Sequence, residues 1–306
     1  MSVSHPLAGV YAAAVTPMDA QGRPLPEALP RLLDFLRARG VHGVLLLGTT
    51  GEGPSHSPEE RLALMQAAAT YRQAHPDLRV LVGTGTPSLD ETVRLTRATF
   101  ALGLDGVVVL PPYYFRRASE DGLFAWFAAL MGQAVPEDGA LFAYHIPQIA
   151  GVGFSLELLA RLKDAFPRRF AGLKDSSGDP EFAAALGARF GSDLLVFTGN
   201  DRLLSHALRH QAGGAITALA NLASPWLREV WESFQQGDEA QARAFQVRLD
   251  AARTALERFS PFAPTLKEVL PALFDLPSWG VKPPLVPLGS EGAQAALSAL
   301  QAAGIP

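Results

Sequence analysis

The chain has 306 residues, of which 48% are hydrophobic and 18% are charged, so it can bury a large core. Its net charge is −4 with acidic and basic residues mixed along the chain, which argues against nucleic acid as a partner. The absence of cysteine excludes disulfides, cysteine nucleophiles and thiolate metal ligands.

The N-terminal segment MSVSHPLAGVYAAAVTPMD lacks the basic region of a signal peptide, and its apolar run is only six residues long. No apolar run elsewhere approaches the ~18 residues of a membrane-spanning helix. We therefore expect a cytoplasmic protein that does not associate with a membrane.

Short apolar runs of strand length then alternate with longer segments of helical periodicity. The runs are almost continuously apolar, which is typical of parallel strands buried on both faces. Between them, the segments that begin at Ser57 and Ser88 have the sequence of a capping box, which predicts the start of a helix. We expect eight strands, at residues 10–17, 43–50, 79–85, 106–112, 140–147, 170–176, 194–200 and 214–221.

The expected strands lie about 25–35 residues apart, which is the length of a βα unit. Eight such units in roughly 220 residues favour a (β/α)8 TIM barrel over an open doubly wound sheet, which stays as the alternative. Beyond the last strand the sequence predicts only helices, with a break at Gly237-Asp238. We therefore expect a barrel catalytic domain over residues 1–236 and a helical C-terminal extension over residues 237–306.

In a barrel of this type the active site lies at the C-terminal ends of the strands, so polar residues there are candidates. The GTTGEG segment offers backbone N–H groups and two hydroxyls that could hold a carboxylate or phosphate, although a plain βα turn would have the same composition. The candidates in chain order are Thr49, Thr50, Glu52, Tyr113, Tyr114, Tyr144, His145, Lys174, Asp175, Ser176, Thr198, Asn200 and Asp201.

Lys174 is the most informative of the four lysines, because it alone lies in an apolar strand, whereas Lys163 and Lys267 lie in amphipathic helical segments where we expect solvent exposure. Alternation places Phe170, Gly172 and Lys174 on one face, and Gly172 would leave room below the amine if that face is the barrel interior. Burial favours the neutral amine, which can form a Schiff base with a carbonyl. The alternative is a side chain that faces outward or pairs with the neighbouring aspartate.

A Schiff base requires a proton to move on and off oxygen, and the hydroxyl of Tyr144 could do this with help from Thr49. The alternative is an interior tyrosine whose hydroxyl binds a backbone carbonyl.

Two other patterns are weaker indications of a functional site. His206 and His210 are spaced i, i+4 as in some metal sites, but no third ligand is near in the sequence, so we expect no metal. The GTGTPS segment lacks the lysine of a phosphate loop, so we interpret it as a βα turn.

Four motifs, GTTGE, PPYY, YxxPxxxG and GLKDSSGD, occur in order at the ends of expected strands two, four, five and six. This set resembles the dihydrodipicolinate synthase / N-acetylneuraminate lyase family, the pyruvate-type class I aldolases. The likeness extends from AAAVTPMD to VKPPL. It implies a (β/α)8 barrel with a helical C-terminal extension, no metal or cofactor, and a homotetramer built as a dimer of dimers.

The resemblance also implies roles for individual residues. Lys174 would form the Schiff base with pyruvate or another 2-oxo acid, and Tyr144 would shuttle protons. Thr49 and Tyr114 would complete the proton relay, with Tyr114 reaching across a subunit interface. The keto-acid pocket would include Thr49, Thr50 and the main chain of Ile216.

Several positions depart from the pattern of known members. The synthases have an arginine five residues after the shuttle tyrosine that binds the aldehyde's carboxylate, and Ile149 at that position cannot do so. The lyases bind a sugar's hydroxyls with a Gly-x-Asp-Glu run, which here is Gly199-Asn200-Asp201-Arg202. Asp201 is kept, and Arg202 either meets an anionic group or faces solvent. In addition, His145 replaces an asparagine, Gly53 a serine, and Ala218 another serine.

These departures favour a Schiff-base class I aldolase that cleaves or forms a 2-oxo-3-deoxy sugar acid or a 4-hydroxy-2-oxo acid from pyruvate and an aldehyde. Expected substrate contacts are Thr50, Ile149, Gly199, Asp201 and Ile216. The alternatives are a 4-hydroxy-tetrahydrodipicolinate synthase, an N-acetylneuraminate lyase, a Schiff-base dehydratase of a 2-oxo sugar acid, and a non-catalytic protein that binds keto acids.

Overall fold

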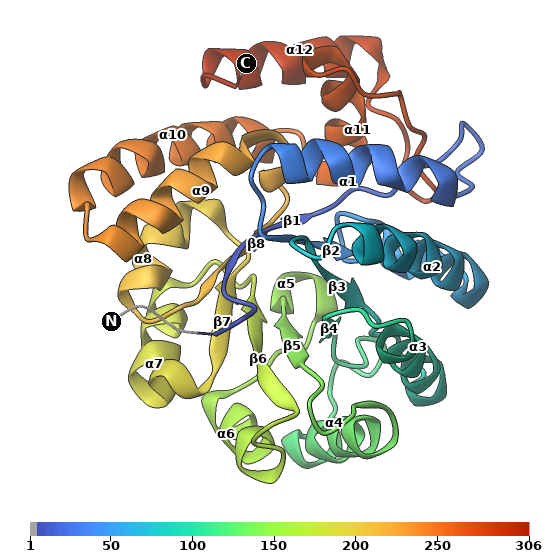
Figure 1. Cartoon of the computed structure of the whole chain (residues 1–306), viewed down its shortest axis with the longest axis vertical. Coiled ribbons are helices and arrows are strands. Elements are labelled where there is room, and N and C mark those ends of the chain that lie inside the picture. The colour runs from blue at the N-terminus through green and yellow to red at the C-terminus, as the bar shows by residue number, and fades with distance from the viewer. Residues whose placement is uncertain (1–4, 306) are drawn as a thin grey trace.

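The computed structural model describes residues 5–305 and contains a closed barrel of eight parallel strands (Figure 1). Each strand pairs with the next, and β8 pairs with β1 to close the barrel. The strands are β1 (Gly9–Ala13), β2 (Gly43–Leu46), β3 (Arg79–Gly83), β4 (Gly106–Val109), β5 (Leu141–His145), β6 (Phe170–Asp175), β7 (Leu195–Thr198) and β8 (Gly214–Thr217). The expected barrel is confirmed, and each strand ends earlier than predicted because the chain leaves the barrel in the loops at that end.

Helices surround the barrel, and all but one of the connections contain a single α-helix. The exception follows β5, where the one-turn helix α5 (Pro147–Ala150) precedes α6 (Leu156–Ala165). Ser57 forms the predicted capping box with Glu60. The other barrel helices are α1 (Leu29–Ala38), α2 (Pro58–Ala74), α3 (Leu89–Ala101), α4 (Glu120–Ala134), α7 (Pro180–Phe190), α8 (Leu204–Arg209) and α9 (Ala220–Gln236).

Strand β6 has an irregularity that sequence alternation does not predict. Leu141 pairs with Phe170 whereas Phe142 pairs with Gly172, so Ala171 is left over as a bulge. Phe170 consequently packs outward among the helices, and the expectation that it shares a face with Lys174 is wrong. A Cβ on Gly172 would lie 1.8 Å from the Leu195 carbonyl oxygen, so this glycine permits the close approach of β7 and does not provide room below the amine.

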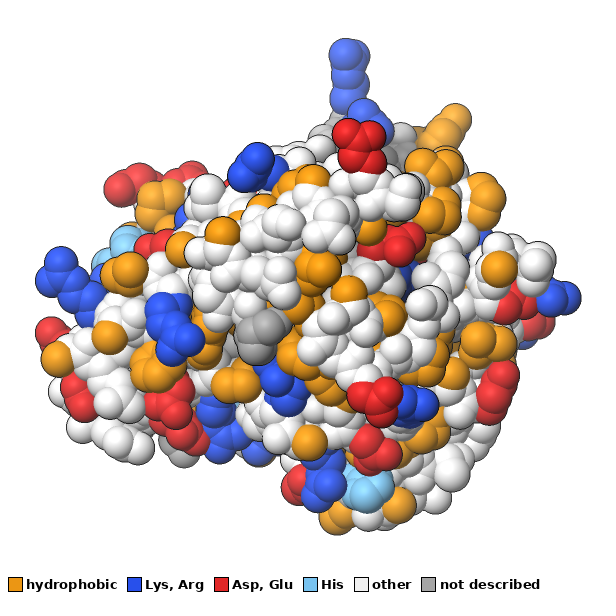
Figure 2. Space-filling view, turned by 90° about the horizontal axis from the view of Figure 1, so that it is seen from above, with side chains coloured by type: hydrophobic (Ala, Val, Ile, Leu, Met, Phe, Trp, Pro, Cys, Tyr) orange, Lys and Arg blue, Asp and Glu red, His pale blue; other side chains and the backbone are white. Residues whose placement is uncertain are grey.

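The C-terminal extension consists of α10 (Glu239–Glu257), α11 (Phe262–Leu273) and α12 (Gly289–Ala302). Figure 1 shows α10 beside α9, and α12 packs on α10 and α11 at the outer surface. Figure 2 shows that acidic and basic side chains are interspersed with hydrophobic ones on this face. No helix in residues 5–305 has the length and apolar character needed to cross a membrane.

A buried ion pair joins the extension to the barrel. Lys267 on α11 is only 2% exposed, so the expectation that it lies in solvent is wrong. Its Nζ lies 2.5 Å from Oε1 of Glu52 and 2.7 Å from the carbonyl oxygen of Gly280. The other carboxylate oxygen of Glu52 accepts the backbone N–H of Lys282 at 2.9 Å. The turn after β2 is therefore fixed by contacts from the far end of the chain.

Candidate active site

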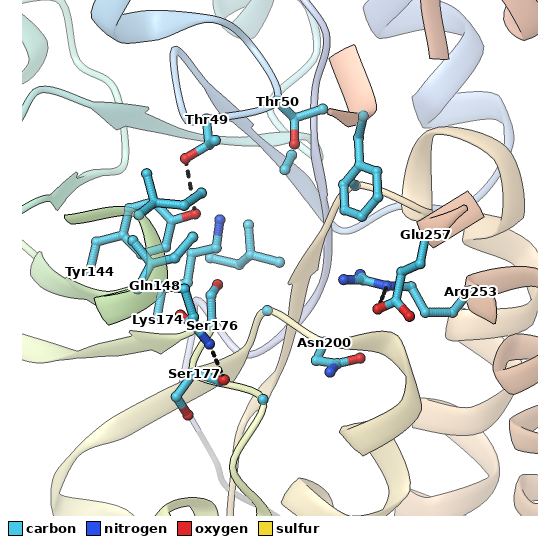
Figure 3. A pocket seen from close by; sticks show the side chains of 18 residues that line it. Thr49, Thr50, Tyr144, Gln148, Lys174, Ser176, Ser177, Asn200, Arg253 and Glu257 are labelled. Atoms are coloured by element: carbon cyan, nitrogen blue, oxygen red, sulfur yellow. Dashed lines mark hydrogen bonds and ion pairs between the residues drawn. The ribbon is translucent and has the colours of Figure 1, made fainter. Parts of the chain in front are cut away.

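A cavity of about 360 Å³ lies at the C-terminal ends of the strands (Figure 3). This is the end at which TIM-barrel enzymes hold their active sites. The structure brings seven of the nine predicted site residues to its wall and leaves out Tyr114 and Asp201. The seven are Thr49, Thr50, Tyr144, Ile149, Lys174, Gly199 and Ile216.

Lys174 lies in β6 and is 3% exposed, with its amine at the cavity. It is the direct register partner of Tyr144 in β5, which places the two side chains next to each other. Its Nζ lies 4.2 Å from the centroid of the Tyr144 ring. The carboxylate of Asp175 accepts the backbone N–H of Ser177 at 2.9 Å, so it caps the following turn. Lys174 therefore points inward, and the alternative of an outward side chain is wrong.

The hydroxyl of Tyr144 lies 3.3 Å from Oγ1 of Thr49, across the barrel from β5 to the turn after β2. Burial alone would raise the pKa of Tyr144, but the charge of Lys174 and hydrogen bonds from Thr49, Lys174 and Ser176 outweigh burial and lower it. A tyrosine whose phenolate is stabilised by a neighbouring amine can both accept and return a proton.

Thr49 and Thr50 both line the cavity because β2 ends at Leu46, before either of them. The turn that follows places Glu52 in the left-handed region, with φ of 55°. That conformation is uncommon for a residue with a side chain, and the buried ion pair of Glu52 with Lys267 holds it. The hydroxyls of the two threonines are thus held on a rigid turn.

The loop after β5 forms the rim of the cavity. Ile149 on α5 lines it and is 58% exposed, so this apolar side chain stands at the entrance. The side-chain amide of Gln148 donates to the carbonyl oxygen of Ser177, which ties α5 to the loop after β6. Behind the rim, Nδ1 of His145 accepts the backbone N–H of Phe154 at 2.9 Å.

Two predicted residues lie away from the cavity wall. Tyr114 follows β4 and is 77% exposed, and its ring packs edge-on against Phe115. Asp201 is fully buried behind the wall, where its Oδ2 accepts from Nη1 of Arg253 at 2.8 Å. The single chain therefore does not bring Tyr114 to the cavity, and Asp201 reaches it only through Arg253.

Three residues of the C-terminal extension line the cavity and were not predicted: Arg253, Glu257 and Phe262. Nε of Arg253 donates to Oε1 of Glu257 at 2.8 Å, and its guanidinium lies 4.9 Å from the centroid of the Phe262 ring. Burial alone would lower the pKa of Arg253, but Asp201 and Glu257 raise it. The only sequence signal is the i, i+4 spacing of Arg253 and Glu257, which is also typical of a solvated ion pair on a helix.

His206 lies on the outer helix α8 and His210 directly follows that helix, with the two ring centroids 4.6 Å apart. One ring nitrogen of His206 already contacts the carbonyl oxygen of Pro180 at 2.9 Å. Within residues 5–305, no three histidine, aspartate or glutamate side chains gather as a metal site would require.

Comparison with known proteins identifies the family. The model of the dihydrodipicolinate synthetase family matches residues 6–303. An "uncharacterized DapA-like lyase" of Chloroflexus aurantiacus is 40% identical over 92% of each chain, and 4-hydroxy-tetrahydrodipicolinate synthase 2 of Halalkalibacterium halodurans is 30% identical over 93% of this chain and 94% of its own. The solved structure of E. coli YagE with pyruvate has a TM-score of 0.91 and 26% identity, over 98% of this chain and 99% of its own. The chain belongs to the dihydrodipicolinate synthetase family and is a lyase of that family.

Proposed function

We propose that the chain is a class I aldolase that joins pyruvate to an aldehyde, or releases both, through a Schiff base on Lys174. The observation that supports this most directly is the position of the Lys174 amine over Tyr144, with the Tyr144 hydroxyl 3.3 Å from Thr49. This group contains an amine nucleophile and a two-hydroxyl relay for its protons. The pyruvate in the YagE structure supports pyruvate as the shared keto acid.

In the cleavage direction the amine of Lys174 attacks the C2 carbonyl of a 4-hydroxy-2-oxo acid, and loss of water leaves a protonated Schiff base. That Schiff base accepts the electron pair of the C3–C4 bond as the bond breaks, while the C4 hydroxyl gives its proton to Tyr144. The aldehyde leaves, the enamine takes a proton at C3, and hydrolysis releases pyruvate and the free amine. Each step needs only the side chains of the cavity and water.

Thr49 and Thr50 would bind the carboxylate of the keto acid, since both lie on the rigid turn at the cavity wall. The other end of the substrate would meet Ile149 and the loop that contains Gly199. As the complete substrate we propose a 2-oxo-3-deoxy sugar acid or another 4-hydroxy-2-oxo acid, because Ile149 at the entrance has no charge to offer a carboxylate on the aldehyde half.

Borohydride reduction in the presence of pyruvate, followed by intact mass measurement, tests the Schiff base. We expect one reduced pyruvate adduct per chain, and none in Lys174→Ala. An absent adduct, or one that persists in that variant, would refute the proposal. A screen of hydroxylated 2-oxo acids, with lactate dehydrogenase to detect pyruvate, then tests cleavage. A dehydratase would instead yield a deoxy-oxo product without pyruvate, and a binding protein would form the adduct without any turnover.

A synthase of 4-hydroxy-tetrahydrodipicolinate is the second candidate, because relatives with that name are 30% and 34% identical to this chain. The isoleucine at position 149 argues against it, since a synthase must hold the carboxylate of its aldehyde substrate. Turnover of pyruvate with aspartate semialdehyde would favour the synthase over the aldolase.

We also propose a homotetramer in which Tyr114 enters the cavity of a neighbouring subunit. The exposed Tyr114 and Phe115, at 77% and 63%, support this because adjacent exposed aromatics are typical of an interface. Light scattering measures the assembly, and Tyr114→Phe measures the contribution of the hydroxyl. A monomer with full activity would contradict both parts of the proposal.

A further inference from the structure

The far end of the cavity is built by the C-terminal extension rather than by the barrel. Arg253 and Glu257 lie one turn apart at the end of α10, and both line the cavity. Figure 3 shows them on the opposite side of the cavity from Tyr144 and Lys174, with the guanidinium pointing inward. A substrate bound to Lys174 through its keto group would therefore direct its other end toward these two side chains.

Two carboxylates fix the orientation of Arg253. Nη1 donates to Asp201 at 2.8 Å and Nε donates to Glu257 at 2.8 Å, while Phe262 lies against the guanidinium. Nη2 forms no hydrogen bond with the described residues 5–305, and the side chain keeps 11% exposure. The N–H groups of Arg253 Nη2 are thus free to donate to a ligand. The guanidinium is already oriented toward the cavity, so binding does not have to order it.

Glu257 is likewise held from two sides but stays open to the cavity. Its Oε1 accepts from Arg253, and its Oε2 pairs with Arg202 from the loop after β7. Its side chain is 35% exposed, which leaves lone pairs available to a ligand. A donor from Arg253 and an acceptor from Glu257 therefore stand side by side.

The charges at this end of the cavity cancel. Asp201 and Glu257 contribute two negative charges, and Arg202 and Arg253 contribute two positive ones, all joined by ion pairs. A carboxylate on the ligand would have to compete with Asp201 or Glu257 for Arg253, and it would lie against the charge of Glu257. A hydroxyl group can donate to Glu257 and accept from Arg253 without breaking either pair.

We propose that Arg253 and Glu257 are specificity-determining residues that bind the hydroxyls of a neutral chain at the end of the substrate remote from the Schiff base. This inference rests on the aldolase function proposed above and names its substrate class: 2-oxo-3-deoxy acids with a neutral polyhydroxy end, and not those that end in a second carboxylate. The acidic residue of this subsite, Glu257, comes from α10, and its ion-pair partner Arg202 comes from the loop after β7.

The test compares two substrates that differ at the remote end, 2-oxo-3-deoxygluconate with terminal hydroxyls and 4-hydroxy-2-oxoglutarate with a carboxylate. We expect the unmodified protein to have the higher kcat/KM for the first. Glu257→Gln removes the negative charge and keeps the shape, and it should lower that preference about tenfold or more, because a hydrogen bond to a charged group is lost and carboxylate repulsion is relieved. Arg253→Met should lower kcat/KM for the hydroxylated acid.

Two controls separate this inference from the proposed aldolase function. The borohydride adduct with pyruvate should form equally in the unmodified protein, Glu257→Gln and Arg253→Met, which also shows that the variants are folded. Glu239→Gln, at the exposed start of the same helix, should leave the substrate preference unchanged.

Lack of an adduct in the unmodified protein would refute the aldolase function itself. The inference alone is overturned if the adduct forms and the dicarboxylic acid is preferred, if neither acid is cleaved, or if Glu257→Gln keeps the original preference. In the last case the cluster would only fasten α10 to the loop after β7. If Arg253→Met fails to fold because Asp201 loses its partner, the Glu257→Gln comparison decides the question by itself.

Discussion

Two opposing effects act on the hydroxyl of Tyr144. Burial raises the pKa of this tyrosine, while the neighbouring Lys174 and the hydrogen bonds from Thr49 and Ser176 lower it and prevail. The register of β5 and β6 creates this balance, because it places Tyr144 and Lys174 directly opposite each other. The Lys174–Tyr144 part of the proposed proton relay therefore follows from strand pairing, whereas Thr49 is placed by the turn after β2.

Tyr144→Phe tests this at the level of one atom. The ring and its packing stay, so the fold should be kept, but the proton transfer to and from the carbinolamine is lost. We expect the rate of borohydride-trappable adduct formation and kcat to fall by about 10²–10⁴-fold. Tyr71→Phe is a matched control, because its hydroxyl bonds to Asp34 on the outer helices. Unchanged kcat in Tyr144→Phe would exclude this hydroxyl from the relay.

At the scale of elements, the turn after β2 depends on α11. The Glu52–Lys267 ion pair is fully buried, and removing one partner of such a pair leaves an uncompensated charge. Lys267→Met should therefore lower the free energy of unfolding by about 3–5 kcal/mol. Because Glu52 is three residues from Thr49, the KM for the keto acid should rise as well.

The double variant Glu52→Gln, Lys267→Met is the control, since it removes both charges together. We expect it to recover part of the lost stability, as measured by urea unfolding. If the single and double variants were equally stable, the broken ion pair would not explain the lower free energy of unfolding. The change in side-chain volume at position 267 would then explain it.

Gly172, next to the bulge in β6, is a sterically constrained position two residues from Lys174. A methyl group there would lie 1.8 Å from the Leu195 carbonyl oxygen, so β6 and β7 would have to separate. Gly172→Ala should thus reduce the midpoint of thermal unfolding and the yield of adduct together. In Gly132→Ala on α4, where nothing beyond the neighbouring residues and the helix's own backbone lies within 4 Å of the new methyl, we expect stabilisation of about 0.5–1 kcal/mol. Wild-type stability of Gly172→Ala would contradict the close approach of these strands.

Over the whole molecule, the barrel could be predicted because its strands are apolar on both faces and follow one another at a regular spacing. Lys174 and Tyr144 could be found for the same reason, as polar groups at the ends of such strands. Arg253 and Glu257 could not, because an i, i+4 pair on a helix has the same pattern whether it faces solvent or a cavity. Whether the pair faces solvent or the cavity depends on where α10 ends relative to the barrel, and no local sequence pattern encodes that position.

Lys267 and the bulge at Ala171 show the same limit. The amphipathic pattern around Lys267 predicts a solvent-exposed side chain, and its partner Glu52 is 215 residues away in the chain. The bulge depends on the register between two strands and changes a single residue of the apolar run. Both features are set by tertiary contacts, so periodicity alone does not reveal them.

Two histidines that accept backbone N–H groups, the half-buried His42 and the buried His145, predict part of the fold's response to acid. Burial lowers the pKa of His42 and of His145 to about 4, from an ordinary value of 6.5. The neutral ring of each accepts a backbone N–H through Nδ1 at 2.9 Å, a bond that protonation would break. The unfolded chain binds these protons more readily, so their contribution to stability is complete above pH 6.5 and is lost as the pH falls toward 4.

Replacement of both histidines by asparagine isolates this effect, because the side-chain oxygen of asparagine can accept the same N–H groups and does not titrate. Urea unfolding between about pH 7.5 and about pH 4, the range in which the unfolded chain takes up these protons before the folded chain does, should show a smaller loss of stability on acidification in the double variant than in the unmodified protein. The carboxylates titrate alike in both proteins, so the difference between the two curves measures the histidines alone. Parallel curves would mean that the two rings do not resist protonation in the folded state, and the acid sensitivity would then belong to other groups.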